Sequence, residues 1–226
     1  MDQQKRVIVF DYDDTLTLDT EQRKQDFFVS IFEDLEVELS GVRDFVRSHR
    51  GISRREKISG ILDVLAGAGY IHDPQSHLER YLERFGQLVE EMTVKAELRP
   101  GAEEALRTLQ ADHSLYLLSA NPQEALERIV ERRGWNPFFR GIYGTSISSK
   151  IEQLGTILLR EGIHPTRVIV VGDGMSDLHA AEAHGCRFIG VRGALTTFSS
   201  DTDVTFPILE EFFSLPTVLA DLVKGG

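Results

Sequence analysis

Three aspartates follow a short apolar run near the start of the chain. Residues 7–10 (Val-Ile-Val-Phe) are typical of a short buried strand, and Asp11, Asp13 and Asp14 come directly after it. Carboxylates this close together repel one another, and they lose hydration if they are partly buried. A bound cation relieves both effects, and an oxygen-rich acidic site suits Mg²⁺. The alternative is an acidic turn in water, so the rest of the chain must decide between the two.

The composition of the chain excludes several classes of protein. With 226 residues, 41% of them hydrophobic and 27% charged, the chain is typical of a globular protein with one large domain or two smaller ones. The net charge of −11 argues against nucleic-acid and membrane partners, which require a basic face. The single cysteine, Cys186, excludes an intramolecular disulfide, and the sequence predicts neither a signal peptide nor a transmembrane segment. We therefore expect a cytoplasmic protein that is a monomer or a homodimer.

A helical insertion follows the first strand. Apolar stripes recur at helical spacing within residues 27–35, 39–46, 58–65 and 78–92, and no β-branched run separates them. Gly67 and Gly69 mark the end of the third helix, and Pro74 marks the start of the fourth. About 75 residues of this kind are enough for a small helical bundle. The sequence therefore predicts a helical domain at residues 17–96.

From Arg99 onward, strands and helices alternate. The expected strands are residues 114–118, 141–143, 167–171 and 187–191, with a short edge strand at 203–205. The expected helices are residues 102–109, 123–133, 150–160, 177–184 and 207–223. Such alternation predicts a parallel sheet with helices on both faces. We therefore expect a Rossmann-like three-layer α/β/α core at residues 1–16 and 97–226, and a cleft between two domains is a usual place for a small-molecule site.

Polar residues stand at four strand ends or at the start of the following helix. In a parallel sheet these ends lie along one edge, where ligands bind. Carboxylates, a hydroxyl and a lysine gathered there suit phosphoryl transfer to one carboxylate, with a second carboxylate moving the proton and a metal neutralising charge. Any one of them alone could be a helix cap or a turn residue. The residues are Asp11, Asp13, Ser119, Asn121, Lys150, Asp173 and Asp177.

The order of these residues resembles the four motifs of the haloacid dehalogenase superfamily. The resemblance spans the whole α/β core, and the helical insertion lies where the C1-type cap of that family lies. Independent turns have no reason to fall in this order, so the full set argues for an enzyme more strongly than any one residue does. The matching segments are Asp11-x-Asp13-x-Thr15, Ser119, Lys150 and Gly172-Asp173-x-x-x-Asp177.

The resemblance implies a chemical role for the residues of the first three motifs. Asp11 would be the nucleophile that forms an aspartyl-phosphate, and Asp13 would be the general acid and then the general base. Ser119 and Lys150 would bind the phosphoryl group, with Asn121 close by as a further phosphate-binding residue.

The same resemblance implies a Mg²⁺ site. The side chains of Asp11 and Asp173 and the backbone carbonyl of Asp13 would be ligands. Asp177 would hold the metal directly or through a water. Thr15 would brace the loop after the first strand.

The acid at position 13 narrows the reaction. Relatives that act on carbon–halogen bonds or phosphonates, or that pump ions, carry another residue at Asp13, so the resemblance implies a phosphatase that hydrolyses a small phosphorylated metabolite, in the phosphoglycolate-phosphatase-like branch. A β-phosphoglucomutase-like mutase is the alternative, but such mutases commonly have an acid directly before Asp173, where this chain has Gly172. Asp14 stands where the family often has glycine and would be a supporting group. A non-catalytic binding module on the same fold is the third interpretation.

A basic cluster in the helical insertion is a candidate for the selection of substrate. The segment from Arg50 to Arg54 resembles the cap segment of β-phosphoglucomutases, and in C1-capped relatives a loop of this kind faces the active site. We therefore hypothesise that Arg50 or Arg54 helps to select the substrate. The alternative is a solvated basic helix start, since Ser53 with Glu56 fits a capping box.

Overall fold

The computed structural model describes residues 5–35, 37–49, 53–144, 149–193 and 205–224. It divides into two compact units, one formed by Met1–Asp19 with Ala96–Gly226 and the other by Thr20–Lys95. The division differs from the expected boundaries because the two chain crossings pair with each other inside the first unit. Thr17 forms an antiparallel bridge with Leu98, and the Leu18 amide donates to the Glu97 carbonyl at 2.9 Å.

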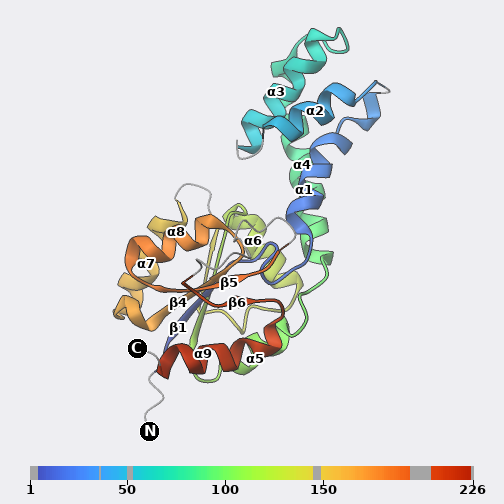
Figure 1. Cartoon of the computed structure of the whole chain (residues 1–226). Coiled ribbons are helices and arrows are strands. Elements are labelled where there is room, and N and C mark those ends of the chain that lie inside the picture. Colours follow the sequence, from blue (N-terminus) through green and yellow to red (C-terminus); the bar gives the residue numbers. More distant parts are fainter. Residues whose placement is uncertain (1–4, 36, 50–52, 145–148, 194–204, 225–226) are drawn as a thin grey trace. The chain divides into compact units, whose positions relative to one another are not determined.

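The first unit contains a parallel sheet in the order β3-β2-β1-β4-β5-β6, as Figure 1 shows. β1 lies between β2 and β4, and all four of its residues are buried, which explains its continuous apolar run. The predicted parallel sheet is confirmed. The strands are β1 (Val7–Phe10), β2 (Ser114–Ser119), β3 (Gly141–Gly144), β4 (Val168–Gly172), β5 (Arg187–Val191) and β6 (Ile208–Leu209).

Helices cover both faces of this sheet, so the predicted three-layer core is also confirmed. α7 and α8 lie on one side of it, and α5 and α9 lie on the other (Figure 1). α6 packs against β3. The helices are α5 (Ala102–Leu109), α6 (Gln123–Arg132), α7 (Lys150–Glu161), α8 (Met175–His184) and α9 (Leu215–Lys224).

The C-terminal segment corrects the expectation of one helix over residues 207–223. It forms β6, a short 3₁₀ helix at Phe212–Ser214 and then α9. β6 exists because its two residues pair with β5 at Gly190 and Val191, which a pattern of apolar residues does not reveal. The expected edge strand at 203–205 falls mainly outside the described residues, and Thr205 is not part of a strand.

The second unit is a helical bundle with its own apolar core. Its helices are α1 (Thr20–Ser30), α2 (Ser40–Ser48), α3 (Arg54–Gly67) and α4 (Pro74–Lys95). Phe28 of α1 stacks on Phe85 of α4 with ring centroids 4.1 Å apart. The Ser53–Glu56 capping box is confirmed and explains why α3 begins at Arg54. Among the described residues, no helix has both the length and the hydropathy that a membrane span requires.

A buried arginine holds the loop that follows β1. The Arg99 side chain donates from Nη2 to the Asp14 carbonyl at 2.6 Å, from Nε to the Thr15 carbonyl at 3.0 Å and from Nη1 to the Glu210 carbonyl at 3.1 Å. Asp14 has a φ of 53°, in the left-handed region that is unfavourable for a residue with a side chain. Two of the contacts of Arg99 therefore stabilise a loop whose backbone is strained, and the third joins this loop to the segment after β6.

We predict that Arg99→Lys destabilises the first unit by about 2 to 3 kcal/mol, because an ammonium group keeps the charge but cannot reach all three carbonyls. Urea unfolding would measure this loss. Trp135, the single tryptophan of the chain, lies buried in the same unit and reports its unfolding by fluorescence.

The matched control is Arg107→Lys. Arg107 is exposed and forms an ion pair with Glu103 one turn away on α5, at 3.0 Å, so its replacement should change stability by less than about 0.5 kcal/mol. Equal losses in the two variants would contradict the role given to Arg99.

Candidate active site

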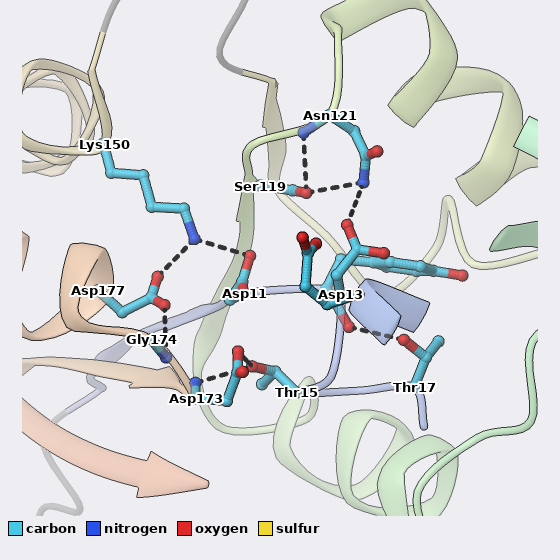
Figure 2. Close-up of polar contacts among 12 residues, drawn as sticks. Asp11, Asp13, Thr15, Thr17, Ser119, Asn121, Lys150, Asp173, Gly174 and Asp177 are labelled. Atoms are coloured by element: carbon cyan, nitrogen blue, oxygen red, sulfur yellow. Dashed lines mark hydrogen bonds and ion pairs between the residues drawn. The ribbon is translucent and has the colours of Figure 1, made fainter. Parts of the chain in front are cut away.

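The structure brings the predicted site residues of the first unit together at one edge of the sheet (Figure 2). β1 is in parallel register with both neighbours, because Phe10 lies opposite Leu117 of β2 and Val171 of β4. The residues that follow these strands therefore emerge side by side. Lys150 joins them from the start of α7, where Ser149 and Glu152 form a capping box.

Lys150 lies between two carboxylates. Its Nζ is 2.9 Å from Oδ1 of Asp11 and 2.7 Å from Oδ1 of Asp177, and all three residues are buried. Burial alone would lower the pKa of Lys150, but the charges of the two aspartates outweigh it and raise the pKa above its usual value. Lys150 is therefore a fixed cation at the centre of the site.

The acidic side of the site has more negative charge than Lys150 can neutralise. One carboxylate oxygen from each of Asp11, Asp173 and Asp177 lies within 4.8 Å of the other two. Burial, followed by the charges of Asp177 and Asp14, raises the pKa of Asp173 to about 7. Burial also raises the pKa of Asp11 well above its usual value, and Lys150 opposes this shift.

These carboxylates fit a hard divalent cation such as Mg²⁺, which takes oxygen ligands and would relieve the repulsion. The residues that could hold it are Asp11, Asp173 and Asp177. The carboxylate of Asp13 is not one of this group, and its expected part in the metal site rests on its backbone carbonyl alone.

A glycine makes room for Asp177. A Cβ atom at Gly172 would lie only 2.4 Å from Cγ of Asp177, so no other residue fits there without moving the carboxylate. Asp177 accepts a hydrogen bond at Oδ2 from the Gly174 amide at 3.3 Å and contacts Lys150 through Oδ1. One side chain thus stabilises the first turn of α8 and also forms part of the site.

Thr15 joins the loop after β1 to the loop after β4. Its Oγ1 donates to Oδ1 of Asp173 and accepts from the Asp173 amide, both at 3.1 Å. Thr15 was expected only to hold the loop after β1. It also orients Asp173, which could hold a metal.

Asn121 contacts Asp13 and Ser119. Its Nδ2 donates to Oδ2 of Asp13 at 2.7 Å and to Oγ of Ser119 at 3.0 Å, and its backbone amide donates to the same Oγ at 3.2 Å. Figure 2 shows the side-chain nitrogen of Asn121 joined by a dashed line to each of the other two side chains. The predicted role of Asn121 as a phosphate-binding residue thus rests on its nearness to Ser119. The shorter of its two side-chain hydrogen bonds is the one to Asp13.

Sequence reasoning did not identify a cluster formed by Tyr12, which lies between Asp11 and Asp13 in the sequence, with Arg133 and Trp135. The Tyr12 hydroxyl accepts from Nε of Arg133 at 2.5 Å, and the guanidinium lies 5.2 Å from the Trp135 ring. Nη2 of Arg133 donates to the Ala96 carbonyl at 2.7 Å, at the second chain crossing. Burial raises the pKa of Tyr12. An aromatic residue between two aspartates gives no pattern from which a distant arginine partner could be found.

Of the two arginines of the insertion that were predicted to help select the substrate, the structure describes only Arg54. Arg50 lies outside the described residues. Arg54 lies in the second unit, with its guanidinium 4.9 Å from the Phe85 ring, and burial lowers its pKa. Lys57, one turn further along α3, is a buried cation that the sequence analysis missed. Its Nζ lies 3.2 Å from Oε1 of Gln25.

Comparison with known proteins gives a family match. The family model of haloacid dehalogenase-like hydrolases matches residues 5–185. A curated relative, the phosphoglycolate phosphatase of Synechococcus elongatus, is 31% identical over 114 residues. That alignment covers 50% of this chain and 54% of the relative, so the match spans about half the length of each.

Solved structures share the fold. A putative β-phosphoglucomutase from Thermotoga maritima superimposes with a TM-score of 0.73 at 21% identity, covering 96% of this chain and 99% of that one. A predicted phosphoglycolate phosphatase from Haemophilus somnus gives 0.71 at 17% identity, with the same coverage. A putative hydrolase of the same superfamily from Bacillus subtilis, bound to magnesium, gives 0.69 at 17% identity, again covering 96% and 99%.

We predict that Mg²⁺ raises the melting temperature of the protein, and that the increase is larger at about pH 8 than at about pH 6. Because the pKa of Asp173 is raised to about 7, a cation must displace a proton from it at the lower pH, whereas the carboxylate is already ionised at the higher one. Thermal unfolding with and without Mg²⁺ would measure both effects.

In this experiment Asp173→Asn should lose most of the Mg²⁺ effect. Asp63→Asn, an exposed position on α3, should keep it and serves as the matched control. An undiminished Mg²⁺ effect in Asp173→Asn would contradict the metal site.

Proposed function

Because the chain belongs to the haloacid dehalogenase-like hydrolases, we propose that it is a Mg²⁺-dependent phosphatase of a small phosphorylated metabolite. The observation that carries the proposal is the position of the buried Lys150 cation between Asp11 and Asp177, beside the further carboxylate of Asp173. A nucleophilic carboxylate, a fixed cation and an acidic cation site are the parts that phosphoryl transfer to a carboxylate requires.

Hydrolysis would occur in two steps. The Asp11 carboxylate attacks phosphorus and the bond from phosphorus to the leaving oxygen breaks, while Asp13 gives a proton to that oxygen. The products are an aspartyl-phosphate and an alcohol. Asp13, now a carboxylate, takes a proton from a water that attacks the same phosphorus, which releases inorganic phosphate and regenerates both aspartates.

The other residues would bind and orient the phosphoryl group. Oγ of Ser119 accepts from two N–H groups of Asn121, so its own hydrogen is left to donate to a phosphoryl oxygen. The ammonium of Lys150 would compensate the negative charge on these oxygens. Mg²⁺ bound by Asp11, Asp173 and Asp177 would supply further positive charge at the same place.

We predict that Asp11→Asn lowers phosphate release from an aryl phosphate by at least about 10³-fold, because an amide cannot form the acyl-phosphate bond. A phosphate-release assay with purified protein and Mg²⁺ would test this, with Asp63→Asn as the control. Full activity in Asp11→Asn would rule out the nucleophile, and no activity in the unmodified protein on any phosphate ester would favour a non-catalytic binding module.

The substrate would be found by a screen of phosphorylated metabolites in the presence of Mg²⁺. 2-Phosphoglycolate is the first candidate, because the Synechococcus relative is a phosphoglycolate phosphatase. A sugar 1-phosphate distinguishes the two reactions, since free phosphate indicates hydrolysis and an isomerised sugar phosphate indicates a mutase. Gly172 in place of an acid before Asp173 favours hydrolysis.

Substrate choice is proposed to involve the basic side chains of the insertion. We predict that the double variant Arg50→Ala/Arg54→Ala lowers kcat/KM about tenfold for phosphate esters with an anionic tail and leaves esters with an uncharged tail unchanged. Kinetics on a panel of esters would measure the difference. The control is Arg55→Ala, because the Arg55 side chain is exposed and forms an ion pair with Glu79 at 2.8 Å. Unchanged kcat/KM for every ester in the double variant would refute this proposal.

A further inference from the structure

We propose that Asn121 is the positioning residue for Asp13, and that it decides which oxygen of Asp13 exchanges the proton during hydrolysis. The inference rests on the proposed function. The donor Nδ2 of Asn121 is 2.7 Å from Oδ2 of Asp13, and both side chains are buried, with 3% and 8% of their surface exposed. A charge-assisted hydrogen bond of this length in a buried site restricts the rotation of the carboxylate.

Asn121 is itself firmly held. Its backbone amide and its side-chain amide both bind Oγ of Ser119, so the two hydrogens of Nδ2 are directed to Ser119 and to Asp13. Pro122 follows directly, and α6 begins at the next residue. Gln123, in the first turn of α6, accepts from the Gly144 amide at 2.6 Å and donates to the Ile142 carbonyl at 3.0 Å, which attaches this turn to β3.

The chemical consequence concerns the two oxygens of Asp13. An N–H group donates to an oxygen lone pair, so the contact with Asn121 engages Oδ2 as an acceptor. The proton of the acid form is then carried by Oδ1, which delivers it to the leaving oxygen. In the second step Oδ1 takes the proton back from the attacking water. Asn121 thus acts on the leaving group through Asp13 and not through the phosphoryl group.

This role predicts a dependence on the leaving group. Departure of 4-nitrophenolate needs little protonation, whereas departure of phenolate or an alkoxide needs the acid. We therefore expect Asn121→Leu to lower kcat/KM about 10²-fold for phenyl phosphate and much less for 4-nitrophenyl phosphate. The parameter kcat/KM is the suitable readout because it reports the step in which the leaving group departs.

Lys150→Arg is the comparison variant. A residue that binds the phosphoryl group affects all esters alike, and the printed contacts of Lys150 are with Asp11 and Asp177, so this variant should lower kcat/KM by the same factor for both substrates. The isosteric Asn121→Asp places a carboxylate where the donor was and should reproduce the selective loss. It also separates the effect from misfolding in the leucine variant, which thermal unfolding would detect.

A double-mutant cycle with Asp13→Asn completes the test. If Asn121 acts through Asp13, Asn121→Leu has little further effect on phenol release in the Asp13→Asn background. Equal losses for the two esters, no loss, or full additivity with Asp13→Asn would each overturn the inference. An unmodified protein that hydrolyses no phosphate ester, or an active Asp11→Asn variant, would instead refute the proposed function.

Discussion

The buried ammonium group of Lys150 is the interaction on which the site depends. Its two partners, Asp11 and Asp177, come from different elements, and each carboxylate would be costly to bury without a cation. The strand order follows the same constraint, because β1 must lie beside β4 for their carboxyl ends to share one lysine. The small volume of Gly172 follows from it as well, since the Asp177 carboxylate occupies the space of a side chain there.

Two further cations organise the loops around this centre. Arg99 binds the carbonyls of the loop after β1, and Arg133 binds the carbonyl of Ala96 and the hydroxyl of Tyr12. Both arginines donate to neutral groups of the first unit. In this acidic protein, therefore, one buried and one half-buried arginine hold the backbone in place, and three aspartates lie together at the edge of the sheet where a cation fits.

Much of this structure could be predicted from local patterns. The strands expected at residues 7–10 and 187–191 have the expected bounds, and the helix at 102–109 begins directly after Pro100 and Gly101 as expected. Helical spacing in the C-terminal segment is misleading, because the pairing of Ile208 with β5 depends on residues distant in the sequence. The order of the motifs could place Asp13 and Asn121 at neighbouring strand ends. Their hydrogen bond, across 108 positions, depends on packing that no spacing encodes.

The insertion between β1 and β2 has a consequence for how the chain is made. The two strands pair in parallel, with Val7 opposite Ser114, yet the whole helical unit is synthesised between them. That unit has its own core and local contacts, so it can fold early and bring its flanking segments, Leu18 and Glu97, close together. On the ribosome, however, both neighbours of β1 emerge later than β1 itself. During translation the apolar residues of β1 therefore stay unpaired until β2 has been made, and in that interval they are exposed to aggregation and to binding by chaperones.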